Sequence, residues 1–139
     1  MILYHYTNVD NKDSILSNGL KACTRYAILS SIRENVVFCW LNKKDNKLLK
    51  PNEICFKVDV DADRCLIADM DYISIAMMYE SGTGVNEIKG KPQNTEASNL
   101  LVQLYEITAV PPNKYYKGMH FSPEVLVKGD ISASCIELC

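Results

Sequence analysis

Apolar and polar residues follow two different periods along the chain, and each period predicts one kind of secondary structure. Segments that are continuously apolar, or apolar at every second position, are typical of buried or half-buried strands. The predicted strands cover residues 2–7, 35–41, 53–60, 64–68, 125–127 and 131–138. Apolar residues spaced by three and four positions predict helices instead. The predicted helices cover residues 10–18, 69–80 and 95–106.

Residues that favour helix ends support these boundaries. Asp10 or Asn11 would cap the first helix and Gly19 would end it, while Asp69 would cap the second. A capping box begins the third helix. One face of that helix would consist of Leu100, Leu101, Leu104 and Tyr105.

The order of these elements predicts an α+β fold. Helices lie between the strands, but the regular alternation of a parallel sheet is missing. We therefore expect one domain over residues 1–139, with a mostly antiparallel, split β-sheet, two main helices and a short N-terminal helix. The polar segment 81–94 would form a long loop, a feature that is often functional.

Composition narrows the class of protein. The chain has 139 residues and a net charge of -2, which gives no overall attraction to nucleic acid. Its six cysteines form no C-x-x-C pair, and neither of its two histidines stands at zinc-ligand spacing. We expect reduced thiols, no metal and a cytoplasmic location. No apolar run approaches the roughly 20 residues that cross a bilayer, so no membrane partner is expected.

Two positions carry candidate chemistry. His5 and Thr7 share one face near the end of the first predicted strand, so an imidazole and a hydroxyl could reach one ligand. The alternative is a core histidine that hydrogen-bonds a backbone carbonyl. Glu124 follows a proline and precedes three apolar residues, which would hold and desolvate its carboxylate as catalysis requires. The alternative for Glu124 is a strand-edge glutamate that faces water.

Taken in order, these segments resemble the ADP-ribosyltransferase superfamily. They are H-Y-T before a short helix ending in N-G-L, the aromatic V-V-F-C-W, and the late E-V-L-V. The chain is most similar to the histidine-tyrosine-glutamate branch, which includes diphtheria-type toxins, poly(ADP-ribose) polymerases and DarT-type DNA-modifying toxins, and within it to small bacterial and phage members. The resemblance implies an ADP-ribosyltransferase-like fold and NAD as the co-substrate.

The resemblance also implies residue roles at the nicotinamide end of NAD. His5 would hydrogen-bond the ribose, the backbone around Tyr6 would hold the carboxamide, and Thr7 would support the adenosine side or the strand end. Phe38 would stack on the nicotinamide ring where the family usually has tyrosine. Trp40 is the alternative stacking platform.

By the same resemblance, Glu124 would be the catalytic residue. Cleavage of the nicotinamide glycosidic bond passes through an oxocarbenium-like ribosyl cation, which a fixed carboxylate stabilises. Nicotinamide leaves as a neutral molecule, so no general acid is required. Either Arg25 or Arg33 would neutralise the pyrophosphate. A surface arginine is the alternative for each.

We therefore expect an NAD-dependent ADP-ribosyltransferase that modifies a macromolecular acceptor, protein or nucleic acid, as a bacterial or phage toxin or effector. Segments 81–94 and 111–120 would present that acceptor. A different function on the same fold would be a catalytically silent NAD or ADP-ribose binder, or a protein-interaction (inhibitor) module. An RNA 2'-phosphotransferase would depend on arginines instead of a late glutamate. An unrelated α+β module would bind no nucleotide at all.

Overall fold

Six strands form one sheet in the order β4-β5-β2-β1-β3-β6, and all neighbouring strands in it are antiparallel. The computed structural model describes residues 1–24, 29–81 and 94–139. The strands are β1 (Ile2–Asn8), β2 (Val36–Trp40), β3 (Glu53–Asp59), β4 (Cys65–Asp69), β5 (Pro123–Lys128) and β6 (Ile136–Leu138). The helices are α1 (Lys12–Asn18), α2 (Met70–Ser81) and α3 (Thr95–Thr108). The predicted α+β class, the antiparallel pairing and the three helices are confirmed, but the strands form one sheet and not the predicted split sheet.

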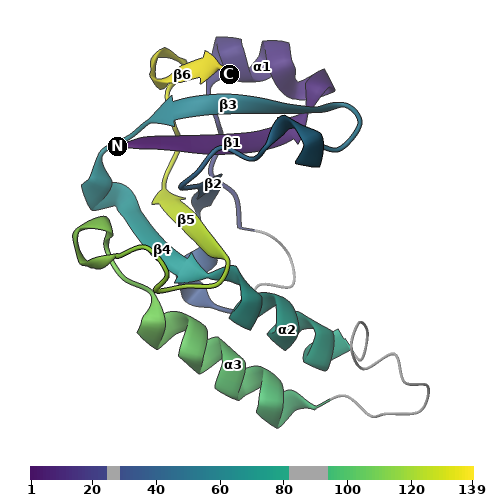
Figure 1. The fold of residues 1–139 in the computed structure, drawn as a ribbon, viewed down its shortest axis with the longest axis vertical. Helices are drawn as coiled ribbons and strands as arrows, with labels where there is room; N and C mark the ends of the chain where they lie inside the picture. Colours follow the sequence, from purple (N-terminus) through teal and green to yellow (C-terminus); the bar gives the residue numbers. More distant parts are fainter. Residues whose placement is uncertain (25–28, 82–93) are drawn as a thin grey trace.

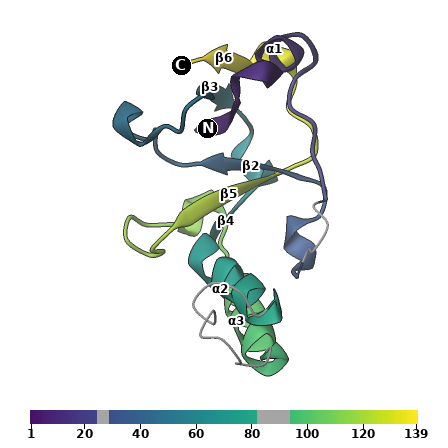
Figure 2. The ribbon, with the colours of Figure 1, turned by 90° about the vertical axis from the view of Figure 1, so that its right-hand side faces the viewer.

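The helices lie at two ends of the sheet. Figure 1 shows α1 beside β3 and β6 at one end, and α2 with α3 beside β4 and β5 at the other. Figure 2 shows β2 and β5 between these two ends. The two groups of helices also pack on opposite faces of the sheet. Because side chains alternate between these faces, the sheet has two separate cores.

The two cores are built from alternating residues of the same strands. The larger core packs the sheet against α1 and the C-terminal segment. It includes Leu3, Ile15, Val37, Cys39, Phe56, Val58, Val125 and Val127. The smaller core packs the opposite face against α2 and α3. It consists of Val36, Ala68, Ile73, Tyr105 and Leu126. Each large buried side chain contributes about 1.5–3 kcal/mol to stability.

The start of the first helix differs from the prediction. A 3₁₀ turn, Val9–Asn11, precedes α1, and Asn8 caps that turn by accepting the N–H of Asp10 at 2.9 Å. Asn11 makes no side-chain capping bond to α1. Asn11 therefore occupies the predicted N-cap position of α1, but the capping hydrogen bond is made one turn upstream by Asn8.

The buried face of α3 also differs from the prediction. Tyr105 is fully buried, but Leu100 and Leu104 are 56% and 39% exposed. The helix packs instead through Ser98, Val102 and Tyr105, which are spaced by four and three residues and form one helical stripe. The predicted face is therefore right at Tyr105 and wrong at Leu100 and Leu104.

We expect Gly19→Ala to destabilise the protein by at least about 1 kcal/mol. Gly19 ends α1 with φ of +78°, and a Cβ there would clash with the carbonyl oxygen of Ile131. Gly118→Ala is the matched control, because Gly118 also has positive φ (+90°) but a Cβ there would meet nothing within 4 Å. Urea unfolding measures both variants, and equal losses would contradict the role of the clash.

Candidate functional site

His5 lies where β1 separates from β2. Among the described residues, Tyr4 and Trp40 form the single register pair between β1 and β2, whereas β1 pairs with β3 from Ile2 to Asn8. His5 follows this pair, so it lies within β1 and not near its end as predicted. The pairing of β1 with β2 stops at Tyr4, whereas its pairing with β3 continues to Asn8.

A backbone hydrogen bond orients the imidazole of His5. Its Nδ1 donates to the carbonyl oxygen of Phe38 at 2.9 Å. A carbonyl oxygen only accepts, so the proton must be on Nδ1, and Nε2 of the neutral ring is an acceptor. The carbonyl bond of the alternative, a core histidine, is therefore present, although His5 is only half-buried and also lines the cavity described next.

A cavity of about 260 Å³ lies beside His5. Residues from β1, α1, the segment after α1 and β2 line it, among them His5, Thr7, Ser14, Gly19, Lys21 and Phe38. His5 and Thr7 both line this space, as their predicted position on one face of the strand requires. The volume is just under the roughly 300 Å³ at which ligand pockets begin. We call this the His5 cavity.

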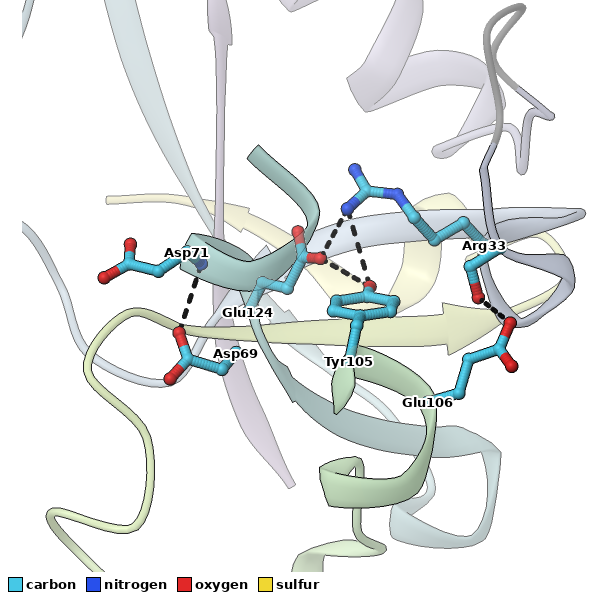
Figure 3. Close-up of polar contacts among 7 residues, drawn as sticks. Arg33, Asp69, Asp71, Tyr105, Glu106 and Glu124 are labelled. Atoms are coloured by element: carbon cyan, nitrogen blue, oxygen red, sulfur yellow. Dashed lines mark hydrogen bonds and ion pairs between the residues drawn. The ribbon is translucent and has the colours of Figure 1, made fainter. Parts of the chain in front are cut away.

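Glu124 lies in a separate buried cluster (Figure 3). Its Oε1 accepts hydrogen bonds from Nη1 of Arg33 at 2.7 Å and from the hydroxyl of Tyr105 at 2.6 Å. Glu124 is 3% exposed and Arg33 is 8% exposed. The predicted desolvated carboxylate at the start of β5 is confirmed, and a glutamate that faces water is wrong. We call these three residues the Glu124 cluster.

The electrostatics of the Glu124 cluster keep Tyr105 protonated. Burial raises the pKa of Tyr105 well above its ordinary value, and the Glu124 carboxylate raises it further. The opposing effect of Arg33 is smaller. Tyr105 is therefore a hydrogen-bond donor to Glu124 throughout the physiological pH range.

Phe38 joins the two sites. Its carbonyl oxygen holds His5 and the residue lines the His5 cavity, while the guanidinium carbon of Arg33 lies 4.6 Å from the centroid of its ring. This is a cation–π contact. The Phe38 ring was predicted to stack on nicotinamide, which is positively charged in NAD. In this structure the positive group over the ring is the Arg33 guanidinium.

The side chains of His5 and Glu124 start on opposite faces of the sheet. Tyr4, Trp40 and Glu124 form one row of register partners across β1, β2 and β5. His5 is next to Tyr4 and so projects from the other face. His5 and Glu124 thus belong to two neighbouring sites that meet at Phe38, and not to the single site that was expected.

Tyr6 and Trp40 belong to a third cluster around Lys44. Nζ of Lys44 lies 4.4 Å from the Tyr6 ring centroid and 5.5 Å from that of Trp40. The hydroxyl of Tyr6 accepts the backbone N–H of Lys44 at 2.6 Å, and burial raises the pKa of Tyr6 to about 12. Trp40 is not among the described residues that line the His5 cavity, so the cavity offers no support for Trp40 as a stacking platform.

Asp69 holds the segment that leads into β5. As predicted, it caps α2 by accepting the N–H of Asp71 at 3.1 Å, and it also accepts the N–H of Phe121 at 2.9 Å and of Ser122 at 3.2 Å. These bonds attach residues 121–122 to the end of β4. The backbone that carries Glu124 is therefore held by Asp69 just before β5 and by the pairing of β5 with β2 and β4.

Arg33 and Tyr105 are the members of the Glu124 cluster whose positions the sequence did not predict. Arg33 was a candidate for the pyrophosphate, yet its guanidinium is bound to Glu124. Tyr105 was expected only as a core residue. The one available signal for its contact with Glu124 was that the hydroxyl of a buried tyrosine usually has a hydrogen-bond partner. Arg25 and residues 82–93 of the predicted acceptor loop lie outside the described residues.

Comparisons with protein-family models, curated proteins and solved structures found no match. Within residues 1–24, 29–81 and 94–139, no helix has the length and apolar character needed to span a membrane. Conclusions about function therefore depend on the residues and geometry of the two sites.

Proposed function

We propose that the protein is an NAD-dependent ADP-ribosyltransferase that transfers ADP-ribose to a protein or nucleic acid. The observation that carries the proposal is the His5 cavity, at the position where β1 separates from β2. There an oriented imidazole and the Thr7 side chain line one space close to ligand size. The resemblance of H-Y-T, V-V-F-C-W and E-V-L-V to the superfamily supports the same function.

The tautomer of His5 supports binding of NAD at the His5 cavity. With Nδ1 bound to Phe38, Nε2 can accept a hydrogen bond from a ribose hydroxyl. Such a bond fixes the sugar beside β2, the strand that pairs with β5. Lys21 also lines the cavity, and its ammonium, which pairs with Asp130 at 3.0 Å in this structure, would have to exchange that partner to bind a phosphate.

Glu124 would supply the chemistry. When the bond between ribose C1' and the nicotinamide nitrogen breaks, its electron pair leaves with nicotinamide, and the ribose acquires positive charge that a carboxylate stabilises. A nucleophilic atom of the acceptor then bonds to C1' and releases its proton. Glu124 projects from the face opposite to His5 and is neutralised by Arg33 in this structure, so the proposed reaction requires NAD to reach both faces where β1 separates from β2, and this ion pair to open when NAD binds.

A catalytically silent NAD or ADP-ribose binder is the second candidate. The burial of Glu124 under Arg33 favours it, since a carboxylate that stays paired cannot stabilise a ribosyl cation. The same His5 cavity would bind the nucleotide, but no nicotinamide would be released. A cytoplasmic toxin or effector role in a bacterium or phage is proposed from the family resemblance alone.

His5→Ala should weaken NAD binding about tenfold, which corresponds to one hydrogen bond of about 1.4 kcal/mol. Isothermal titration calorimetry with NAD measures the change. His5→Gln is the matched variant, because its amide retains a donor and an acceptor and should recover part of the affinity. Equal affinity of the wild-type protein and His5→Ala would contradict binding at the His5 cavity. No NAD binding by the wild-type protein would contradict both candidate functions.

A further inference from the structure

We propose that Tyr105 is a positioning residue that holds the Glu124 carboxylate in place for the transfer reaction. This inference rests on the proposed function, because it assigns a role to Tyr105 at the same glutamate. Its starting point is the hydrogen bond of 2.6 Å from the Tyr105 hydroxyl to Oε1 of Glu124.

The phenol ring of Tyr105 is fixed by its packing. It is 0% exposed and belongs to the smaller core with Ile73 of α2 and Leu126 of β5. The end of α3 is in turn tied to β4, because Ile67 and Val110 exchange backbone hydrogen bonds of 2.8 and 2.9 Å. The position of the hydroxyl is therefore set by helix and sheet together.

Arg33 binds the same oxygen but cannot perform this role alone. Its positive charge cancels the negative charge that would stabilise a ribosyl cation. Tyr105 is neutral, and its raised pKa keeps it a donor. When the Arg33 ion pair opens, the bond from Tyr105 can persist, so the carboxylate keeps its orientation and regains its full charge.

The test is Tyr105→Phe, which removes only the hydroxyl. We expect kcat for nicotinamide release from NAD to fall about tenfold, the rate equivalent of one hydrogen bond to a charged group. KM for NAD should not change, because the His5 cavity is intact. Tyr72→Phe is the matched control, since Tyr72 packs against the same core from α2 and should retain the wild-type kcat.

A change in KM with unchanged kcat, or an equal loss of kcat in Tyr72→Phe, would overturn the proposal. In a Glu124→Gln background, Tyr105→Phe should cause no further loss of kcat. A purely structural role would lower the rate by the same factor in both backgrounds, and that result would also overturn the proposal.

A second measurement separates failure of this inference from failure of the proposed function. If the wild-type protein releases no nicotinamide, the proposed function fails, but the contact can still be tested by urea unfolding of Tyr105→Phe, Glu124→Gln and the double variant. A contact that orients Glu124 makes the two effects on stability non-additive. Additive effects would overturn the contact itself.

Discussion

Replacing Arg33 with methionine should lower the free energy of unfolding by about 3–5 kcal/mol, the largest stability effect that we expect in this protein. Methionine retains the apolar length that packs on Phe38 but removes the positive charge that pairs with Glu124. Since Glu124 is 3% exposed, its charge would remain buried without the 2.7 Å ion pair. Urea unfolding measures the loss.

Lys21→Met is the matched control for Arg33→Met. It breaks the Lys21–Asp130 ion pair, whose side chains are 70% and 54% exposed, so we expect a loss of no more than about 1 kcal/mol. Adding Glu124→Gln to Arg33→Met should restore part of the stability, because the unpaired charge is removed. Similar losses for Arg33→Met and Lys21→Met would contradict a buried charge pair.

Glu124→Gln should reduce nicotinamide release by at least about 100-fold, the cost of removing a preorganised stabiliser of transition-state charge. Glutamine has the same shape and can still accept the Tyr105 hydrogen bond, but it carries no negative charge. Chromatographic measurement of nicotinamide gives the rate, and calorimetry should show that NAD still binds.

The control for Glu124→Gln is the same substitution at Glu137. Glu137 is an exposed residue of β6, and its carboxylate pairs with Lys57 at 3.2 Å. This variant should release nicotinamide at the wild-type rate. A Glu124→Gln protein that retains that rate would exclude Glu124 as the catalytic residue and leave the resemblance without its main chemical support.

The strands and helices could be predicted because each has a local period. Residues 53–60 alternate, and β3 buries Phe56 and Val58 as that alternation predicts. The face of α3 could not be predicted in this way, because burial there depends on contacts with α2 and β4 that are remote in sequence. Leu100 and Leu104 satisfy the helical period as well as Ser98 and Val102 do, and only the neighbouring elements select between the two stripes.

The candidate site shows the same limit. His5, Phe38 and Glu124 could each be selected from local sequence, but their relation depends on sheet order and register. The pairing of β2 with both β1 and β5 places His5 and Glu124 on opposite faces. The Arg33–Glu124 ion pair joins residues 91 positions apart, and no local pattern indicates such a partner.

The most direct test of the proposed function is transfer of labelled ADP-ribose from NAD to the macromolecules of a bacterial lysate by the wild-type protein. Glu124→Gln serves as the parallel control, and protease and nuclease digestion identify the class of acceptor. We predict label in one macromolecular fraction, with nicotinamide released in proportion, and at least about 100-fold less of both products with Glu124→Gln. Binding of NAD without label or nicotinamide would contradict the transferase and support the silent binder.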